Sequence, residues 1–204
     1  IGNHNKQKQS TCQVVCFSSR KEGKKRGRIL FCGRFENWSK RIDRLLHIWA
    51  KVEPVLTDWK LVLVGDGRDG KMLRKLAADL KLRRISFEGM QKNVAEYYRK
   101  ASVVCLTSET EGWPLALTEG QAHGCIGVAF GATSGIREIL DGDCGFAVSA
   151  FDEAEFAHTL ITLASLDEDR IMKMRINGVR KRAEYAPEAI ADKWKKLFDI
   201  LVMQ

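Results

Sequence analysis

Short apolar runs alternate with segments of helical spacing along most of this chain. Continuous apolar runs predict six strands, over residues 28–33, 60–65, 84–89, 103–109, 125–130 and 145–150. Between them, apolar residues recur at helical spacing, as Ile42, Leu45 and Trp49 do. Helices are predicted over residues 40–56, 71–80, 94–100, a segment from about 114, 136–140 and most of 152–204. Strands separated by helices predict an α/β fold with a doubly wound parallel sheet.

Two carboxylates bracket the start of one predicted helix. Glu111 and Glu119 enclose a segment that follows a buried strand, and Pro114 suits the first turn of the helix. We expect Glu111 to lie in the loop and Glu119 just over one turn inside the helix. Such a crossover places side chains at the carboxyl edge of a parallel sheet, where α/β proteins bind ligands. The N–H groups at the helix start are free to bind an anion.

Two cations are expected at the same edge of the sheet. Arg34 follows Gly33 at the end of the first predicted strand, and Lys40 is predicted to open the next helix. Two fixed cations beside a helix N-terminus suit a diphosphate. The alternative is that these cations, like the two acids, are solvated surface groups.

Composition limits the class of protein. The chain has 204 residues, 45% hydrophobic and 29% charged, which is ordinary for a globular protein with a core. No apolar run approaches the ~20 residues of a membrane span, and we recognise no signal peptide, so cytoplasmic folding is expected. The six cysteines have no CxxC spacing and are expected to be reduced. The four histidines lack neighbouring ligands, so no metal site is predicted.

Much of the net charge of +8 lies in residues 19–28. This segment has no interleaved aromatic residues, which indicates a solvated connector rather than a nucleic-acid interface. A basic surface favours attraction to anionic lipid or to a phosphorylated ligand.

A glycine-rich segment supports an alternative function. Gly65 to Gly70 matches the pattern G-x-G-x-x-G, follows a strand and opens a helix, and Glu88 lies at a suitable distance to bind a ribose. This pattern predicts an NAD-binding Rossmann domain. Against it, the segment follows the second strand rather than the first, and a tight turn before a helix explains the same glycines.

Five segments together resemble the donor-binding C-terminal domain of retaining GT-B glycosyltransferases with an E-x7-E motif, the glycosyl transferases group 1 type. They are GRFENWSKRIDRLL, WKLVLVGDG, ISFEGMQKN, YYRKASVVCLTSETEGWPLALTEGQAHG and SGIREILDGDCGFAV. The resemblance covers residues 28–204 and implies one Rossmann-like half of a GT-B fold. It implies transfer of a sugar from a nucleoside diphosphate sugar, with UDP as the expected nucleotide, to a glycan or lipid acceptor. In that family the matching GDG is a structural turn.

The resemblance also implies catalytic roles. Arg34 and Lys40 would bind the diphosphate and stabilise the leaving group, with no metal ion or other cofactor. Glu111 would contact the donor sugar near the reacting carbon, and Glu119 would accept hydrogen bonds from the ribose hydroxyls.

Further residues are implied to bind the substrate. The backbone N–H groups of Leu115 and Ala116 would extend the diphosphate site, and the main chain around Met90 and Gln91 would bind the base. The remaining substrate-binding residues would be Gly33 and Gly112. Pro114 stands where many members have glycine, and proline offers no N–H donor.

The resemblance covers one of two expected domains. We interpret residues 1–27 as a connector, with an extra strand at 14–18 as an option, and residues 28–204 as the nucleotide-sugar-binding domain with C-terminal helices. The start of the chain resembles the end of an interdomain connection, so an N-terminal acceptor domain is expected as a partner and the chain alone is expected to be inactive. The resemblance further implies a role in cell envelope polysaccharide synthesis, and peripheral membrane contact of the full-length protein is compatible with that role. The alternative is a nucleotide-binding module without catalysis.

Overall fold

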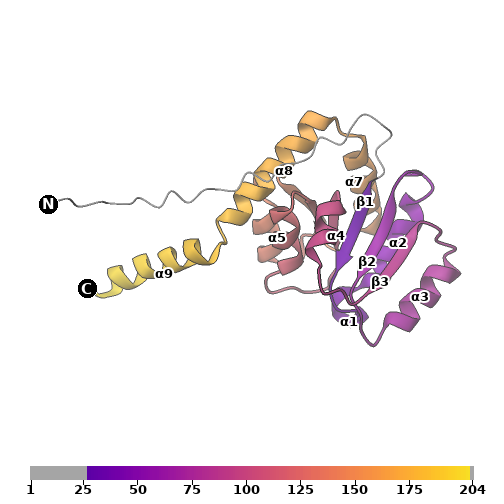
Figure 1. The fold of residues 1–204 in the computed structure, drawn as a ribbon, viewed down its shortest axis with the longest axis horizontal. Coiled ribbons are helices and arrows are strands. Elements are labelled where there is room, and N and C mark those ends of the chain that lie inside the picture. Colours follow the sequence, from indigo (N-terminus) through magenta and orange to yellow (C-terminus); the bar gives the residue numbers. More distant parts are fainter. Residues whose placement is uncertain (1–26, 203–204) are drawn as a thin grey trace.

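A single parallel sheet organises the domain. The computed structural model describes residues 27–202, and Figure 1 shows the arrangement of its elements. The sheet has six strands in the order β3-β2-β1-β4-β5-β6. They are β1 (Arg28–Cys32), β2 (Lys60–Val64), β3 (Ile85–Gly89), β4 (Val103–Leu106), β5 (Ile126–Phe130) and β6 (Gly145–Val148). The chain starts at the sheet centre, winds outward to β3 and returns to wind the other way from β4, so the doubly wound α/β prediction is confirmed.

Helices cover both faces of this sheet. They are α1 (Asn37–Lys40), α2 (Ile42–Val52), α3 (Gly70–Asp79), α4 (Ala95–Lys100), α5 (Leu115–Ala122), α6 (Ser134–Leu140), α7 (Glu153–Ser165), α8 (Glu168–Ala183) and α9 (Pro187–Val202). Right-handed crossovers place α2 and α3 on one face, and α4 and α5 on the other. Helix α2 packs against α3 and α7, and α5 packs against α8. The central strands β4 and β5 are buried along their whole length, which explains their continuous apolar sequence.

Two elements differ from their predicted bounds. The predicted helix over 40–56 is two helices, because Arg41 adopts the left-handed region (φ 44°) between α1 and α2. Lys40 therefore ends α1, and the prediction that it opens the next helix is wrong. The strand predicted over 103–109 ends at Leu106, and beyond it the backbone N–H of Glu109 donates to the carbonyl of Ser39 (2.8 Å) rather than to a neighbouring strand.

The expected connector, the optional strand at 14–18, His4, Cys12 and Cys16 lie outside the described residues. Within residues 27–202 no cysteine forms a disulfide. No helix in that part of the chain is long and apolar enough to cross a membrane.

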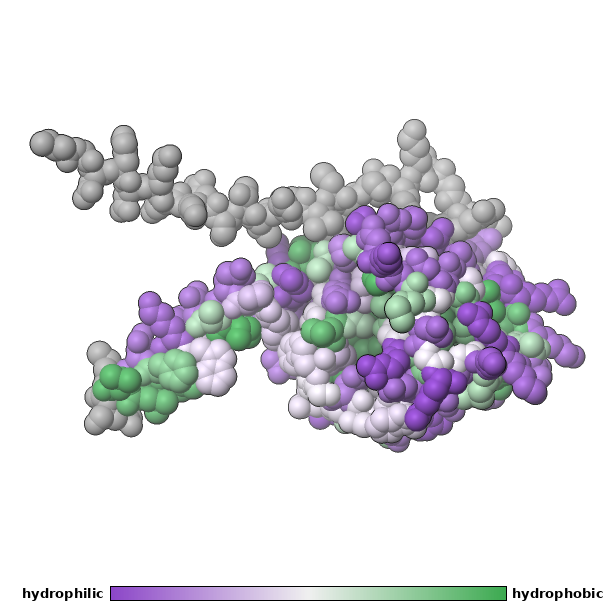
Figure 2. All heavy atoms as spheres, turned by 60° about the horizontal axis from the view of Figure 1, so that its bottom comes forward, coloured by the Kyte–Doolittle hydropathy of each residue, from purple (hydrophilic) through white to green (hydrophobic). Residues whose placement is uncertain are grey.

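Helix α9 projects from the body of the domain (Figure 1) and buries none of its residues. Its apolar side chains gather on one side, which Figure 2 shows in green. They include Trp194, Leu197, Phe198 and Leu201, all more than two fifths exposed.

Candidate functional site

A pocket of about 340 Å³ lies where β1 and β4 end and α5 begins. It is lined by Cys32, Gly33, Arg34, Lys40, Tyr98, Leu106, Glu111, Trp113, Pro114, Leu115, Ala116 and Glu119. The structure thus brings both predicted cations and both predicted carboxylates to one pocket. Glu111 lies in the loop before α5, and Glu119 is the fifth residue of that helix, as their spacing had predicted.

Lys40 and Glu111 are in direct contact in this pocket. The Lys40 Nζ donates to Glu111 Oε1 at 2.7 Å, and the hydroxyl of Ser108 donates to the same oxygen at 2.7 Å. The side chain of Glu111 is only 10% exposed and that of Lys40 is 28% exposed. Partial withdrawal from water strengthens such a charge-assisted bond. The Glu111 carboxylate is therefore held in one orientation near the N-terminus of α5.

Contacts distant in sequence hold this pair together. The backbone N–H of Glu109 donates to the carbonyl of Ser39 at 2.8 Å, and the Arg41 guanidinium forms an ion pair with the Glu109 carboxylate at 3.1 Å. The Thr107 hydroxyl binds the same turn. These bonds fasten the loop after β4 to the junction of α1 and α2, which places Lys40 beside Glu111.

Arg34 is less constrained than Lys40. Its side chain is 71% exposed, and its guanidinium lies 3.1 Å from the carboxylate of Glu36. Because exposed pairs of this kind are weak, the guanidinium can turn toward an anion in the pocket at low cost.

The start of α5 faces the same pocket. Pro114 is the N-cap residue of α5, with no side-chain cap, and the helix begins at Leu115. Pro114 thus lies one position before the first turn, where its lack of an N–H removes no helical bond. The first N–H groups of a helix lack intrahelical acceptors, so those of Leu115 and Ala116 are available to an anion in the pocket that both residues line.

Glu119 has a buried partner. The Tyr98 hydroxyl donates to Glu119 Oε2 at 2.8 Å, and Tyr98 is 2% exposed. Burial raises the pKa of Tyr98 well above its ordinary value, and the Cys32 thiol and the Glu119 carboxylate act in the same direction. Burial also raises the pKa of Cys32. Both groups are therefore protonated at neutral pH.

Several predicted residues lie away from this pocket. Met90 is 81% exposed just after β3, and Gly112 lies in the loop before α5 with open space beside its Cα. Neither they nor Gln91 is among the described residues that line the pocket. Gln91 instead lines a second pocket of about 300 Å³, where its side chain donates to the carbonyl of Glu88 at 2.6 Å.

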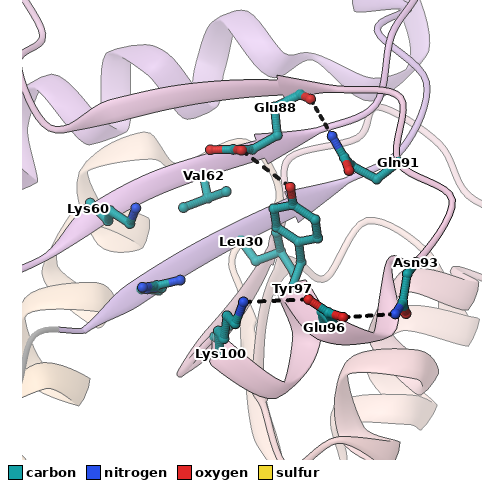
Figure 3. Close-up of a pocket in the computed structure, with 11 residues that line it drawn as sticks. Leu30, Lys60, Val62, Glu88, Gln91, Asn93, Glu96, Tyr97 and Lys100 are labelled. Atoms are coloured by element: carbon teal, nitrogen blue, oxygen red, sulfur yellow. Dashed lines mark hydrogen bonds and ion pairs between the residues drawn. The ribbon is translucent and has the colours of Figure 1, made fainter.

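Figure 3 shows this second pocket, between the sheet face and α4. Tyr97 points into it and donates to Glu88 Oε2 at 3.3 Å. Lys100 lies 3.6 Å from Glu96 on the same helix. Tyr97 and Tyr98 are thus consecutive tyrosines that each bind a glutamate, in different pockets.

Backbone conformation and close packing explain Gly65 and Gly67, the first two glycines of the segment 65–70. Gly65 has φ 136°, and a Cβ at Gly67 would lie 2.6 Å from the carbonyl oxygen of Phe35. The N–H of Phe35 donates to the carbonyl of Asp66 at 2.9 Å, and that of Asp69 donates to the carbonyl of Phe35 at 3.1 Å. The turn therefore supports the loop that carries Arg34, and Gly65 and Gly67 are accounted for without a dinucleotide.

Sequence reasoning did not identify Cys32, Tyr98, Ser108 or Trp113 as site residues. The signal for Tyr98 was an aromatic residue at helical spacing from Val94 on the short helix before the motif, which by itself indicates only packing. Among the described residues, no group of three or more His, Cys, Asp or Glu side chains could hold a metal ion.

Known proteins resemble this chain over most of its length. The family model described as "Glycosyl transferases group 1" matches residues 26–165. The amylovoran biosynthesis glycosyltransferase AmsD of Erwinia amylovora is 30% identical over 177 residues, which cover 86% of this chain and 49% of that protein. The chain therefore spans about half the length of this curated relative.

Solved structures share the fold. S. aureus TarM, in a complex with UDP, alpha-GlcNAc-glycerol and fondaparinux, superimposes with a TM-score of 0.78 at 21% identity, over 88% of this chain and 36% of that chain. The C-terminal domain of the glycosyl transferase group 1 family protein LpcC from Francisella tularensis superimposes with a TM-score of 0.68 at 24% identity, over 76% of this chain and 83% of that domain.

Proposed function

This chain belongs to the glycosyl transferases group 1 family, and we propose that it is the donor-binding half of a retaining glycosyltransferase. Its Rossmann-like sheet matches part of GT-B glycosyltransferase structures. In this proposal the complete protein moves a sugar from a nucleoside diphosphate sugar to a glycan or lipid acceptor. The name of AmsD, an amylovoran biosynthesis glycosyltransferase, supports a product of the polysaccharide class.

One observation carries the proposal: the Lys40–Glu111 pair lies at the N-terminus of α5 in a pocket that also contains Arg34 and Glu119. A diphosphate in this pocket would meet two cations and the free N–H groups of the helix start. These groups are fixed before the reaction, so they can stabilise the negative charge that grows on the departing diphosphate. No metal ion is needed in this scheme, because the cations and the helix supply the positive potential.

In this proposal the carboxylates of Glu111 and Glu119 bind different parts of the donor, the sugar and the ribose. Glu111 lies beside Lys40, so a sugar attached to the diphosphate would meet this carboxylate close to the reacting carbon. Glu119 lies just over one turn into α5, and its carboxylate would accept hydrogen bonds from the ribose hydroxyls. Met90 and Gln91 follow β3 at the same sheet edge, and their main chain would bind the base. We propose UDP as the nucleotide because the TarM complex contains UDP.

The acceptor is proposed to bind a second domain, N-terminal to this one in the complete protein. Two facts support this: the chain spans about half of AmsD, and the apolar face of α9 is exposed. The exposed apolar face of α9 is also compatible with a peripheral membrane contact of a cytoplasmic enzyme. Transfer requires donor and acceptor in near-attack geometry, so the chain alone should bind nucleotide without appreciable transfer.

Calorimetric titration of the chain with UDP, GDP, ADP and NAD, with and without EDTA, tests the proposal. We expect saturable UDP binding that is insensitive to EDTA. Preference for NAD, or a strict metal requirement, would overturn it. Mass spectrometry of the longer polypeptide, incubated with its best donor and candidate acceptors, should detect product, and proton NMR of that product should show retained anomeric configuration. Binding without any transfer would instead favour the non-catalytic module.

A further inference from the structure

Tyr98 joins the core of the domain to the candidate site. Its ring is buried against α5, where it stacks on His123 with a centroid distance of 5.8 Å and an interplanar angle of 13°. Its hydroxyl reaches the pocket wall between the end of β1 and the second turn of α5, and donates to Glu119 Oε2 at 2.8 Å. The hydroxyl of the buried Tyr98 ring thus contacts the carboxylate of Glu119, which is an exposed residue.

The contact restricts a side chain that would otherwise be mobile. An exposed glutamate on a helix samples several rotamers, and each ligand that binds it must first select one of them. A donor fixed by burial selects the rotamer before the ligand arrives. An ionised carboxylate has about four acceptor positions, so the bond from Tyr98 leaves others for ligand hydroxyls.

The Tyr98 hydroxyl shares the pocket wall with a thiol. Cys32, at the end of β1, also lines the pocket and acts with burial to raise the pKa of Tyr98. Since burial keeps both groups protonated, the hydroxyl stays a donor across the physiological pH range. The hydroxyl is therefore a donor to Glu119 throughout that range.

We propose that Tyr98 is a positioning residue of the nucleoside site, whose hydroxyl holds the Glu119 carboxylate in the orientation that binds the ribose hydroxyls. This inference rests on the proposed function, because it assumes that a nucleoside diphosphate occupies the pocket. In the alternative, Glu119 merely satisfies a buried hydroxyl. Both accounts allow some loss of stability on removal of the hydroxyl, but only positioning predicts an effect that depends on the ribose.

Tyr97 provides the matched control. It is the preceding residue of the same helix, and its hydroxyl also donates to a glutamate, Glu88, in the pocket of Figure 3. Tyr97→Phe and Tyr98→Phe therefore remove the same atom from the same helix, in two different pockets. Tyr98→Phe keeps the buried ring and its stacking on His123.

The test is calorimetric titration of each variant with UDP and with 2′,3′-dideoxy-UDP, which lacks the ribose hydroxyls. Tyr98→Phe should weaken UDP binding by about 3- to 10-fold, the usual effect of one hydrogen bond, and leave dideoxy-UDP binding unchanged. Tyr97→Phe should change neither affinity. In a Glu119→Ala background, Tyr98→Phe should have no further effect on UDP, because the partner of its hydroxyl is gone.

Two results would overturn the positioning role while leaving the proposed function intact. In the first, Glu119→Ala weakens UDP binding but Tyr98→Phe does not. In the second, Tyr98→Phe weakens both nucleotides equally, which is also what a partly unfolded variant would show. Failure of the proposed function is distinct, because the unmodified chain would then not bind UDP at all, and the positioning role would be refuted with it.

Discussion

Lys40 is the residue whose replacement most directly perturbs the proposed diphosphate site. Its ammonium is bonded to Glu111, so a diphosphate must compete with that carboxylate. A hydrogen bond to a charged group contributes about 1.5–3 kcal/mol, whereas a partly exposed ion pair contributes up to about 1 kcal/mol. With the full ion pair subtracted, about 0.5–2 kcal/mol remains, so Lys40→Ala should weaken UDP binding by about two- to thirty-fold.

The same competition predicts an effect of opposite sign. Glu111→Gln removes the charge that holds Lys40, so it should tighten UDP binding by up to about fivefold, the value of one ion pair. The matched control for Lys40→Ala is Lys75→Ala, because Lys75 is an exposed lysine on α3 that pairs with Asp79 at 2.6 Å. Lys75→Ala changes the net charge by the same amount as Lys40→Ala and should not affect UDP binding.

Calorimetry of UDP binding at fixed salt measures all three variants, with circular dichroism to confirm that each is folded. Unchanged affinity in Lys40→Ala would refute the role of the cation. If Glu111→Gln weakened UDP as much as Lys40→Ala did, the carboxylate would be binding the nucleotide rather than competing with it.

Three further predictions concern the carboxylates, the glycine turn and His123. Glu119→Ala should weaken UDP itself, whereas Glu111→Ala should not weaken UDP and should weaken only the sugar nucleotide; comparable losses for both ligands would refute this division. Gly67→Ala should destabilise the domain by about 1–3 kcal/mol in denaturant unfolding, because its Cβ would lie 2.6 Å from a backbone oxygen, whereas Gly112→Ala has open space and should be neutral. Burial, and then Arg99, lower the pKa of His123 below its usual 6.5, so its contribution to stability is present above that pH and is lost as the pH falls. Urea unfolding at a series of pH values should show a shallower acid dependence in His123→Gln, and an identical slope would count against it.

The strands and most helices could be predicted because their signals are local. Strands β4 and β5 are buried on both faces and therefore read as continuous apolar runs. The placement of Glu111 and Glu119 was equally local, since both belong to one loop and the helix that follows it. The strand order, by contrast, depends on which way each crossover turns and is not encoded in periodicity.

The rest of the site depends on contacts between distant residues. The break at Arg41 is stabilised by Thr107, 66 residues away, so no local pattern could show that Lys40 ends a helix. Tyr98 contacts Glu119 across 21 residues, and its sequence context is that of an ordinary core aromatic. Both contacts arise only when α4, α5 and the α1–α2 junction meet at one sheet edge.

A crystal structure of the chain with bound UDP would test the central claim most directly, because it locates the nucleotide among the competing pockets. The account predicts the diphosphate between Lys40, Arg34 and the N-terminus of α5, with the ribose hydroxyls on Glu119 and no metal ion between them. Nucleotide bound at the turn of residues 65–70, or in the pocket of Figure 3, would contradict it.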